Sequence, residues 1–331
     1  MLKPKTLARY DQPVPRYTSY PTAPHFTEAV DAATHTRWLA EIPSGDSLSL
    51  YVHIPFCDTM CWFCGCHTRI VNRYEPIAAY LDHVTAEVER VAGTLGKRHR
   101  ASHVHWGGGT PTSLAPADIL RLSDALRTHF DFDEESEFAV ESDPRGVGEE
   151  TIAALGQAGV TRVSLGVQDF SPRVQQAVNR IQPFDETKRV IDSLRSVGIA
   201  EINIDLMYGL PHQGTDELLA TAEKVLELEP TRLALFGYAH VPWMKVHQRM
   251  IDEDALPGTE ARWQQAGAAR AFLEEHGFTT IGLDHFARDD DPMAAALKAG
   301  VLHRNFQGYT TDRANTLIGF GASSISSLPA G

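Results

Sequence analysis

Short runs of β-branched and other apolar residues alternate along the chain with longer segments whose apolar residues recur at helical spacing. The runs that predict strands cover residues 47–54, 102–106, 137–142, 162–167, 200–207 and 232–238. The intervening segments predict helices at about 77–94, 116–130, 149–157, 172–178 with 185–197, and 215–228. Six strand–helix units in succession indicate a parallel sheet with right-handed crossovers. We therefore expect an α/β fold, an open or partial (β/α)6-type barrel. A further helix at 259–276 and a further strand at 278–286 follow it.

Residues with distinctive chemistry come directly after the predicted strands. A cysteine-rich loop follows the first strand, and the sequence Gly-Gly-Gly-Thr-Pro, residues 107–111, follows the second. Glu141, Gln168 and Asp205 stand at the ends of the third, fourth and fifth strands. Each one alone is compatible with an ordinary turn or a solvated strand end. Because parallel sheets bind ligands at the carboxyl ends of their strands, all of them together predict a site at one rim.

All four cysteines of the chain lie within ten residues, as Cys57, Cys61, Cys64 and Cys66, in the spacing C-x3-C-x2-C-x-C. Three interpretations compete. Disulfides suit secreted proteins, and this chain begins without an apolar signal segment. Tetrahedral zinc usually takes two cysteine pairs from separate turns, and the Cys64-Gly-Cys66 pair is cramped for that geometry. Thiolates on one short loop can also hold an iron–sulfur cluster, and the spacing favours this interpretation.

The composition limits the classes of function. The chain has 331 residues, of which 43% are hydrophobic and 22% charged, values typical of a globular enzyme. A net charge of −13 argues against nucleic acid as a partner, and it requires any anionic substrate to meet a local basic pocket. No stretch approaches eighteen uninterrupted apolar residues, so we expect no membrane span and a cytoplasmic location.

The segment from Cys57 to Cys64, with Phe63 before the third cysteine, resembles the loop of the radical S-adenosylmethionine (radical SAM) enzymes. The resemblance implies that Cys57, Cys61 and Cys64 hold three irons of a [4Fe-4S] cluster. S-adenosylmethionine chelates the fourth iron in that superfamily. Cys66 is an additional cysteine. A free cysteine packs as a small buried residue, so we do not count it as a ligand, although it is close enough to replace one or to serve the chemistry.

Further motifs resemble, within that superfamily, the oxygen-independent coproporphyrinogen III oxidases (dehydrogenases) of haem synthesis. They run along nearly the whole chain, and their residues are 15–22, 51–57, 63–66, 105–112, 141–145, 164–170, 178–182, 203–206 and 208–211. The resemblance also implies that the related haem chaperones lack both the arm at Arg16–Pro21 and the fourth cysteine, which this chain has.

The resemblance implies that a 5′-deoxyadenosyl radical takes hydrogen from two propionates of coproporphyrinogen III. Loss of CO2 and of one further electron from each then gives protoporphyrinogen IX. It also implies two S-adenosylmethionine molecules. The first set of binding residues is Tyr51, Gly108, Glu141 and Ile325. The second set is Phe63, Gly109, Thr110, Gln168, Arg180, Asp205 and Ala239. No protein nucleophile or general base is needed for hydrogen abstraction, so we name no catalytic side chain.

The substrate has four carboxylates, and the N-terminal arm places a cation between aromatic rings. We hypothesise that Arg16, Tyr17 and Tyr20 bind propionate. The alternative is a surface arm that packs on the barrel.

The expected organisation has an arm and helix at 1–45, a radical SAM barrel at 46–285 and the start of a C-terminal region at 286–331. The family continues into a helical domain that we expect to be missing here, which leaves turnover by this chain open. We expect a monomer that takes single electrons from a donor such as flavodoxin or ferredoxin. A haem chaperone and a radical SAM methyltransferase remain the alternative functions.

Overall fold

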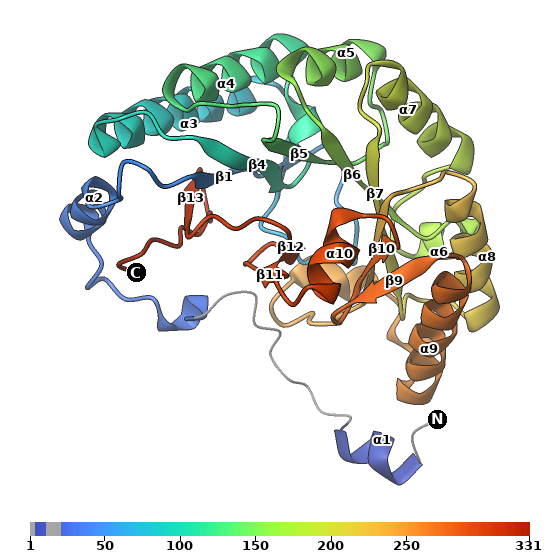
Figure 1. The fold of residues 1–331 in the computed structure, drawn as a ribbon. Helices are drawn as coiled ribbons and strands as arrows, with labels where there is room; N and C mark the ends of the chain where they lie inside the picture. The colour runs from blue at the N-terminus through green and yellow to red at the C-terminus, as the bar shows by residue number, and fades with distance from the viewer. Residues whose placement is uncertain (1–3, 11–20) are drawn as a thin grey trace.

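The computed structural model describes residues 4–10 and 21–331 (Figure 1). Its main sheet has nine strands in the order β13-β1-β4-β5-β6-β7-β8-β10-β9. Those strands are β1 (Leu48–Ile54), β4 (Ala101–Gly108), β5 (Glu137–Ser142), β6 (Arg162–Gln168), β7 (Glu201–Tyr208), β8 (Arg232–Gly237), β9 (Phe278–Ile281), β10 (His285–Arg288) and β13 (Thr316–Phe320). All pairs from β13 to β8 are parallel, and β10 pairs antiparallel with β8 and β9. The predicted partial (β/α) barrel is confirmed.

Helices line the outer side of the curved sheet (Figure 1). They are α3 (Glu75–Leu95), α4 (Pro116–His129), α5 (Glu149–Ala158), α7 (Phe184–Ser196) and α8 (Thr215–Leu226). The remaining helices are α1 (Pro4–Tyr10), α2 (Ala32–Ala40), α6 (Pro172–Ala177), α9 (Thr259–Glu275) and α10 (Pro292–Lys298), with 3-10 turns at Ala23–His25, Pro111–Ser113, Val246–Met250 and Glu253–Ala255. The short strand pairs are β2 (Phe56–Cys57) with β3 (Arg69–Ile70), and β11 (His303–Arg304) with β12 (Tyr309–Thr310). Each predicted helix is present within a few residues of its expected bounds.

Alternation along each strand separates an apolar face from a polar face. Outward residues such as Val52, Trp106 and Ile204 are fully buried and belong to the core between the sheet and the helices. Inward residues carry the polar chemistry, because Tyr51 stacks on His105 and Ser164 lies beside Asp205. The barrel interior is therefore polar although the strands are buried on both sides.

The N-terminal ends of the strands are closed by buried ion pairs. Arg162 of β6 bridges Glu137 of β5 at 3.3 Å and Glu201 of β7 at 3.2 Å. Arg232 of β8 pairs with Asp291 at 2.9 Å, and the two side chains are 8% and 3% exposed. These ion pairs stabilise the N-terminal end of the barrel. The predicted ligand site therefore lies at the opposite end, where the strands have their carboxyl ends.

One strand prediction is wrong, and one strand was not predicted. Residues 278–286 do not form a single strand but a hairpin, β9 and β10, whose turn begins at Gly282 with φ +62°. That left-handed conformation is accessible to glycine and ends the extended run. β13 was not predicted. It pairs with the outer edge of β1 and brings part of the segment 286–331 into the barrel sheet.

Candidate active site

The cysteine loop leaves β1 at the carboxyl end of the sheet and is held in a fixed shape. Phe56 and Cys57 pair with Arg69 and Ile70, which closes the loop at its base. The Asn179 side-chain amide donates to the carbonyl of Met60 at 2.9 Å. Cys61 is buried, Cys57 and Cys64 are half-buried, and Cys66 is exposed. The expectation that Cys66 is a buried residue is therefore wrong, because the residue is exposed to solvent.

The four thiols are free and have different surroundings. Cys57 Sγ lies 3.6 Å from the Thr68 hydroxyl, and burial raises its pKa to about 11. A hydrogen bond from the Cys66 thiol lowers the pKa of Cys64, and the same contact raises the pKa of Cys66. In the described part of the chain, no group of three or more His, Cys, Asp or Glu side chains is placed to hold a single metal ion. Three thiols on one loop instead fit a cluster of several irons, whose bridging sulfides separate the thiolates.

The glycine turn after β4 lies against the base of the cysteine loop. The Gly109 N–H donates to Ile54 O at 2.9 Å, and the Thr110 N–H donates to Phe56 O at 2.8 Å. A Cβ atom on Gly109 would lie 2.5 Å from Phe56 O, and one on Gly108 would lie 2.6 Å from the His53 ring. Side chains at these positions would therefore separate the turn from the loop.

Glu141, at the end of β5, is tied to both neighbouring elements. His105 Nε2 lies 3.0 Å from one carboxylate oxygen, and the Gly108 N–H donates to the other at 3.1 Å. Burial acts to raise the pKa of Glu141, but these hydrogen bonds and the charge of His105 outweigh it, so the pKa is lowered. The side chain still has 40% of its surface exposed, as expected for a carboxylate that faces an internal cavity.

Tyr51 of β1 continues this polar face. Its ring stacks on His105 at 5.8 Å between centroids, and its hydroxyl lies 2.9 Å from His53 Nδ1. Tyr80 of α3 donates to the carbonyl of His53 at 2.7 Å. Both histidines thus position predicted site residues. No histidine was singled out from the sequence, because hydrogen abstraction needs no general base.

The residues expected at the other half of the rim lie on β6 and β7. Gln168 has φ +70° at a register irregularity between β6 and β7, and such a bulge redirects a side chain. Gly166 is paired with Asp205 in the sheet. Burial, followed by the charge of Glu141, raises the pKa of Asp205 to about 7. These positions lie beside one another at the rim, as their place in the sheet requires.

Arg180 is the buried cation of this half, with only 6% of the residue exposed. Its Nη1 donates to Asp143 Oδ2 at 2.9 Å and to Cys61 Sγ at 3.3 Å, and its Nη2 donates to the carbonyl of Gly166. Its Nε is buried without a hydrogen-bond partner among the described residues. A buried donor of this kind costs about 1–3 kcal/mol unless something accepts from it, so it fits a site that holds a polar ligand.

A segment after β8 covers the cysteine loop. Gln248 donates from Nε2 to the carbonyls of both Phe63 and Ala239, at 3.1 and 3.2 Å. Lys245 donates to the Cys66 carbonyl at 2.9 Å, and His247 Nε2 lies 2.7 Å from the Cys64 carbonyl. Phe63 and Ala239, expected to share one ligand, are thus brought together. Gln248, Lys245 and His247 have no local sequence signal for these contacts, because their partners on the cysteine loop lie more than 170 positions away.

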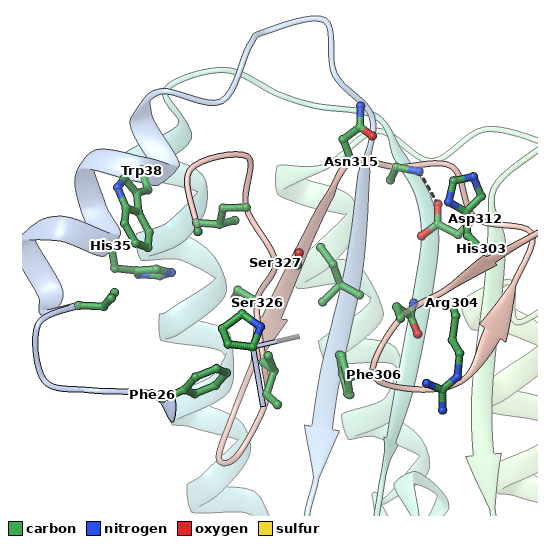
Figure 2. Close-up of a pocket in the computed structure, with 18 of the residues that line it drawn as sticks. Phe26, His35, Trp38, His303, Arg304, Phe306, Asp312, Asn315, Ser326 and Ser327 are labelled. Carbon is green, nitrogen blue, oxygen red and sulfur yellow. Dashed lines mark hydrogen bonds between the residues drawn. The ribbon is translucent and has the colours of Figure 1, made fainter. Parts of the chain in front are cut away.

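A cavity of about 920 Å³ opens between the segment 21–38 and the C-terminal part of the chain (Figure 2). Among the residues that the structure describes, Ile325 is the one predicted site residue that lines it. Phe306 also lines it and packs edge-on against Tyr51 at 4.9 Å, so the cavity approaches the polar face of the barrel. Trp38 and Phe26 give it aromatic walls (Figure 2). The hypothesised propionate residues Arg16, Tyr17 and Tyr20 lie outside the described residues.

Comparisons with known proteins agree with this architecture. Residues 51–225 match the model of the radical SAM superfamily. A protein of Bradyrhizobium diazoefficiens named oxygen-independent coproporphyrinogen III oxidase is 53% identical over 97% of this chain and 71% of its own length. A protein of Escherichia coli K12 with the same name is 42% identical over 97% of this chain and 70% of its own.

A solved structure gives the same result in three dimensions. Coproporphyrinogen III oxidase from Escherichia coli, described as a radical SAM enzyme, matches with a TM-score of 0.91 and 40% identity. The match covers 98% of this chain and 73% of that one. No helix among residues 4–10 and 21–331 is long and apolar enough to cross a membrane. The chain belongs to the oxygen-independent coproporphyrinogen III oxidase family of radical SAM enzymes, and its cofactors are a [4Fe-4S] cluster and S-adenosylmethionine.

Proposed function

We propose that this chain converts coproporphyrinogen III to protoporphyrinogen IX without oxygen, by turning two propionates into vinyl groups. The observation that carries the proposal is 53% identity over 97% of the chain to a relative with the corresponding name. The polar rim of the barrel supports it, because it gathers thiols, a glycine turn and buried charges at the ends of neighbouring strands.

Cys57, Cys61 and Cys64 would hold the cluster through their thiolates. When bound, the cluster and S-adenosylmethionine supply the one-electron chemistry that removes hydrogen from the substrate. The chain itself positions these groups and keeps water from them. Gln248 and His247 hold the cysteine loop in place by binding the carbonyls of Phe63 and Cys64. The turn at Gly109 holds the start of the loop through its hydrogen bond to Ile54.

The two sets of proposed S-adenosylmethionine residues fall on two halves of the sheet. Tyr51, Gly108, Glu141 and Ile325 belong to β1, β4, β5 and the segment after β13. Of the second set, Gln168, Arg180, Asp205 and Ala239 come from β6, the segment after α6, β7 and the segment after β8, in that order. Phe63 joins this half through Gln248, and Gly109 and Thr110 lie between the halves at the cysteine loop. This division supports two binding positions on either side of the loop.

The substrate carboxylates require cations close to the barrel, since the chain as a whole is negative. We propose that Arg16, Tyr17 and Tyr20 bind one propionate. The cavity in Figure 2 offers a second region, because Arg304 and His303 line it beside aromatic side chains. Its approach to Tyr51 through Phe306 supports entry of the substrate from this side.

An anaerobic assay tests the proposal. The protein is reconstituted with iron and sulfide and given dithionite, S-adenosylmethionine and coproporphyrinogen III. We expect CO2 and protoporphyrinogen IX, with activity lost in Cys64→Ala and the cluster retained in the matched variant Cys66→Ala. Haem bound at one equivalent without CO2 release would indicate a haem chaperone instead. S-adenosylhomocysteine as the main product would indicate a methyltransferase.

A further inference from the structure

Two arginines next to the cysteine loop each donate hydrogen bonds both to one cysteine sulfur and to one aspartate. Arg145 Nη2 donates to Cys61 Sγ at 3.2 Å and to Asp143 Oδ2 at 2.6 Å. Arg180 Nη1 donates to the same two atoms, at 3.3 and 2.9 Å. The sulfur and the carboxylate oxygen therefore accept from the same two guanidinium NH2 groups.

This group of residues is built into the fold. The Arg145 and Asp143 side chains are each 19% exposed, and that of Arg180 is 7% exposed. Arg145 Nε also donates to Asp143 Oδ1 at 3.0 Å, and the Asp143 N–H donates to the Thr110 hydroxyl at 2.9 Å. Asp143 is thus fixed to the glycine turn, and it fixes Arg145 in turn. Burial acts to raise the pKa of Asp143, but the two arginines outweigh it, so the carboxylate stays ionised.

Hydrogen bonds to the ligating sulfurs and nearby charge set the reduction potential of an iron–sulfur cluster. A guanidinium is always protonated, so its N–H donors stabilise the more negative, reduced state of a cluster bound at Cys61. The Asp143 carboxylate has the opposite effect, because its negative charge lies beside the same NH2 groups and offsets the charge of the two arginines. The two residues oppose each other across one thiolate.

We propose that Arg145 and Asp143 are positioning residues that set the reduction potential of the cluster through Cys61. Arg145 raises the potential and Asp143 lowers it. The inference rests on the proposed function in that Cys61 is taken as a cluster ligand, but it does not depend on the substrate. Arg145 is not among the residues proposed to bind S-adenosylmethionine, which distinguishes its role from that of Arg180.

The test compares cluster potentials without turnover. Wild type, Arg145→Met, Arg145→Lys and Asp143→Asn are reconstituted, and the reduced cluster is followed by electron paramagnetic resonance in a redox titration. At the wild-type midpoint, we expect Arg145→Met to lower the ratio of reduced to oxidised cluster about tenfold, a shift of about 59 mV for one electron. Asp143→Asn should raise that ratio. Arg145→Lys keeps the positive charge, so its ratio of reduced to oxidised cluster should stay close to that of the wild type.

The opposite signs separate this role from a structural one, since damage to the loop would move both variants in the same direction. Arg189→Met is the matched control, because it removes the same charge from a side chain 46% exposed on α7. Equal midpoints in all variants, or shifts of the same sign in Arg145→Met and Asp143→Asn, would overturn the proposal. If the wild type binds no iron and sulfide, the proposed function fails as well. Iron and sulfide content per chain therefore distinguishes the two failures.

Discussion

The contact between the glycine turn and the cysteine loop allows a steric prediction at Gly109. A methyl group there would lie 2.5 Å from Phe56 O and 2.8 Å from Phe56 N, which are backbone atoms that cannot rotate away. The glycine turn and the loop must then separate, although the backbone conformation of Gly109 itself permits alanine. The same methyl group would lie 2.8 Å from the Thr68 hydroxyl, so Gly109→Ala acts on the contact between the turn and the base of the loop.

The cost follows from the contacts that separation would break. Overpacking of this kind costs about 1–3 kcal/mol. Each of the two backbone hydrogen bonds, from Gly109 to Ile54 and from Thr110 to Phe56, contributes about 1 kcal/mol. We therefore expect Gly109→Ala to destabilise the fold by about 3–5 kcal/mol and to reduce the iron held per chain.

Gly93→Ala is the matched control, because it adds the same methyl group to α3 where no atom lies within 4 Å. Alanine in a helix stabilises by about 0.5–1 kcal/mol relative to glycine, so this variant should unfold at a slightly higher temperature. Thermal unfolding followed by circular dichroism, with iron analysis after reconstitution, compares the two. A Gly109→Ala protein that unfolds at the wild-type temperature and binds as much iron would refute the steric argument.

Three further predictions concern other layers of the barrel. Because the pKa of Asp205 is raised to about 7, the folded state keeps a proton that the unfolded state releases. Stability should therefore fall from about pH 4 to pH 7, and Asp205→Asn should remove part of that slope in thermal unfolding. Asp291→Ala removes the N-cap of α10 and leaves the buried Arg232 unpaired, so we expect the free energy of unfolding in urea to fall by about 3–5 kcal/mol. Asp291→Asn keeps the capping oxygen and should lower it less. Tyr80→Phe breaks the hydrogen bonds to the His53 carbonyl and from the Ala322 N–H and should cost about 1–2 kcal/mol; an unchanged midpoint would contradict this.

Much of the site was predictable because the barrel turns sequence order into spatial order. The carboxyl ends of parallel strands meet at one rim, so Glu141, Gln168 and Asp205 had to lie near the cysteine loop once the strands were recognised. The packing of Gly109 on Phe56 also follows from a glycine beside a crowded loop. These conclusions needed only local patterns and one rule of topology.

The parts that were missed depend on contacts between distant segments. Lys245 and His247 bind carbonyls of the cysteine loop from 179 and 183 positions away, and nothing near them in the sequence marks that role. β13 reads locally as a short apolar stretch, and only its pairing with β1 makes it a strand of the sheet. Asp143 and Arg145 were visible within a motif, but their shared hydrogen bonds to Cys61 were not.

The two carboxylates on the polar face differ in a way that matches their proposed ligands. Hydrogen bonds from His105 and Gly108 keep Glu141 ionised, so it suits a cationic group such as the amino group of S-adenosylmethionine. Asp205 has a weaker partner, Ser164 at 3.4 Å, and it feels the charge of Glu141 as well as burial. Two ionised carboxylates in one enclosed space repel each other. A ligand whose hydroxyl groups donate hydrogen bonds to Asp205 would stabilise its ionised form. The second position should therefore bind ribose hydroxyls more tightly above pH 7 than below, whereas the first should bind equally on both sides of that pH. Equilibrium binding of S-adenosylmethionine to wild type and Asp205→Asn at pH 6 and pH 8 measures this difference.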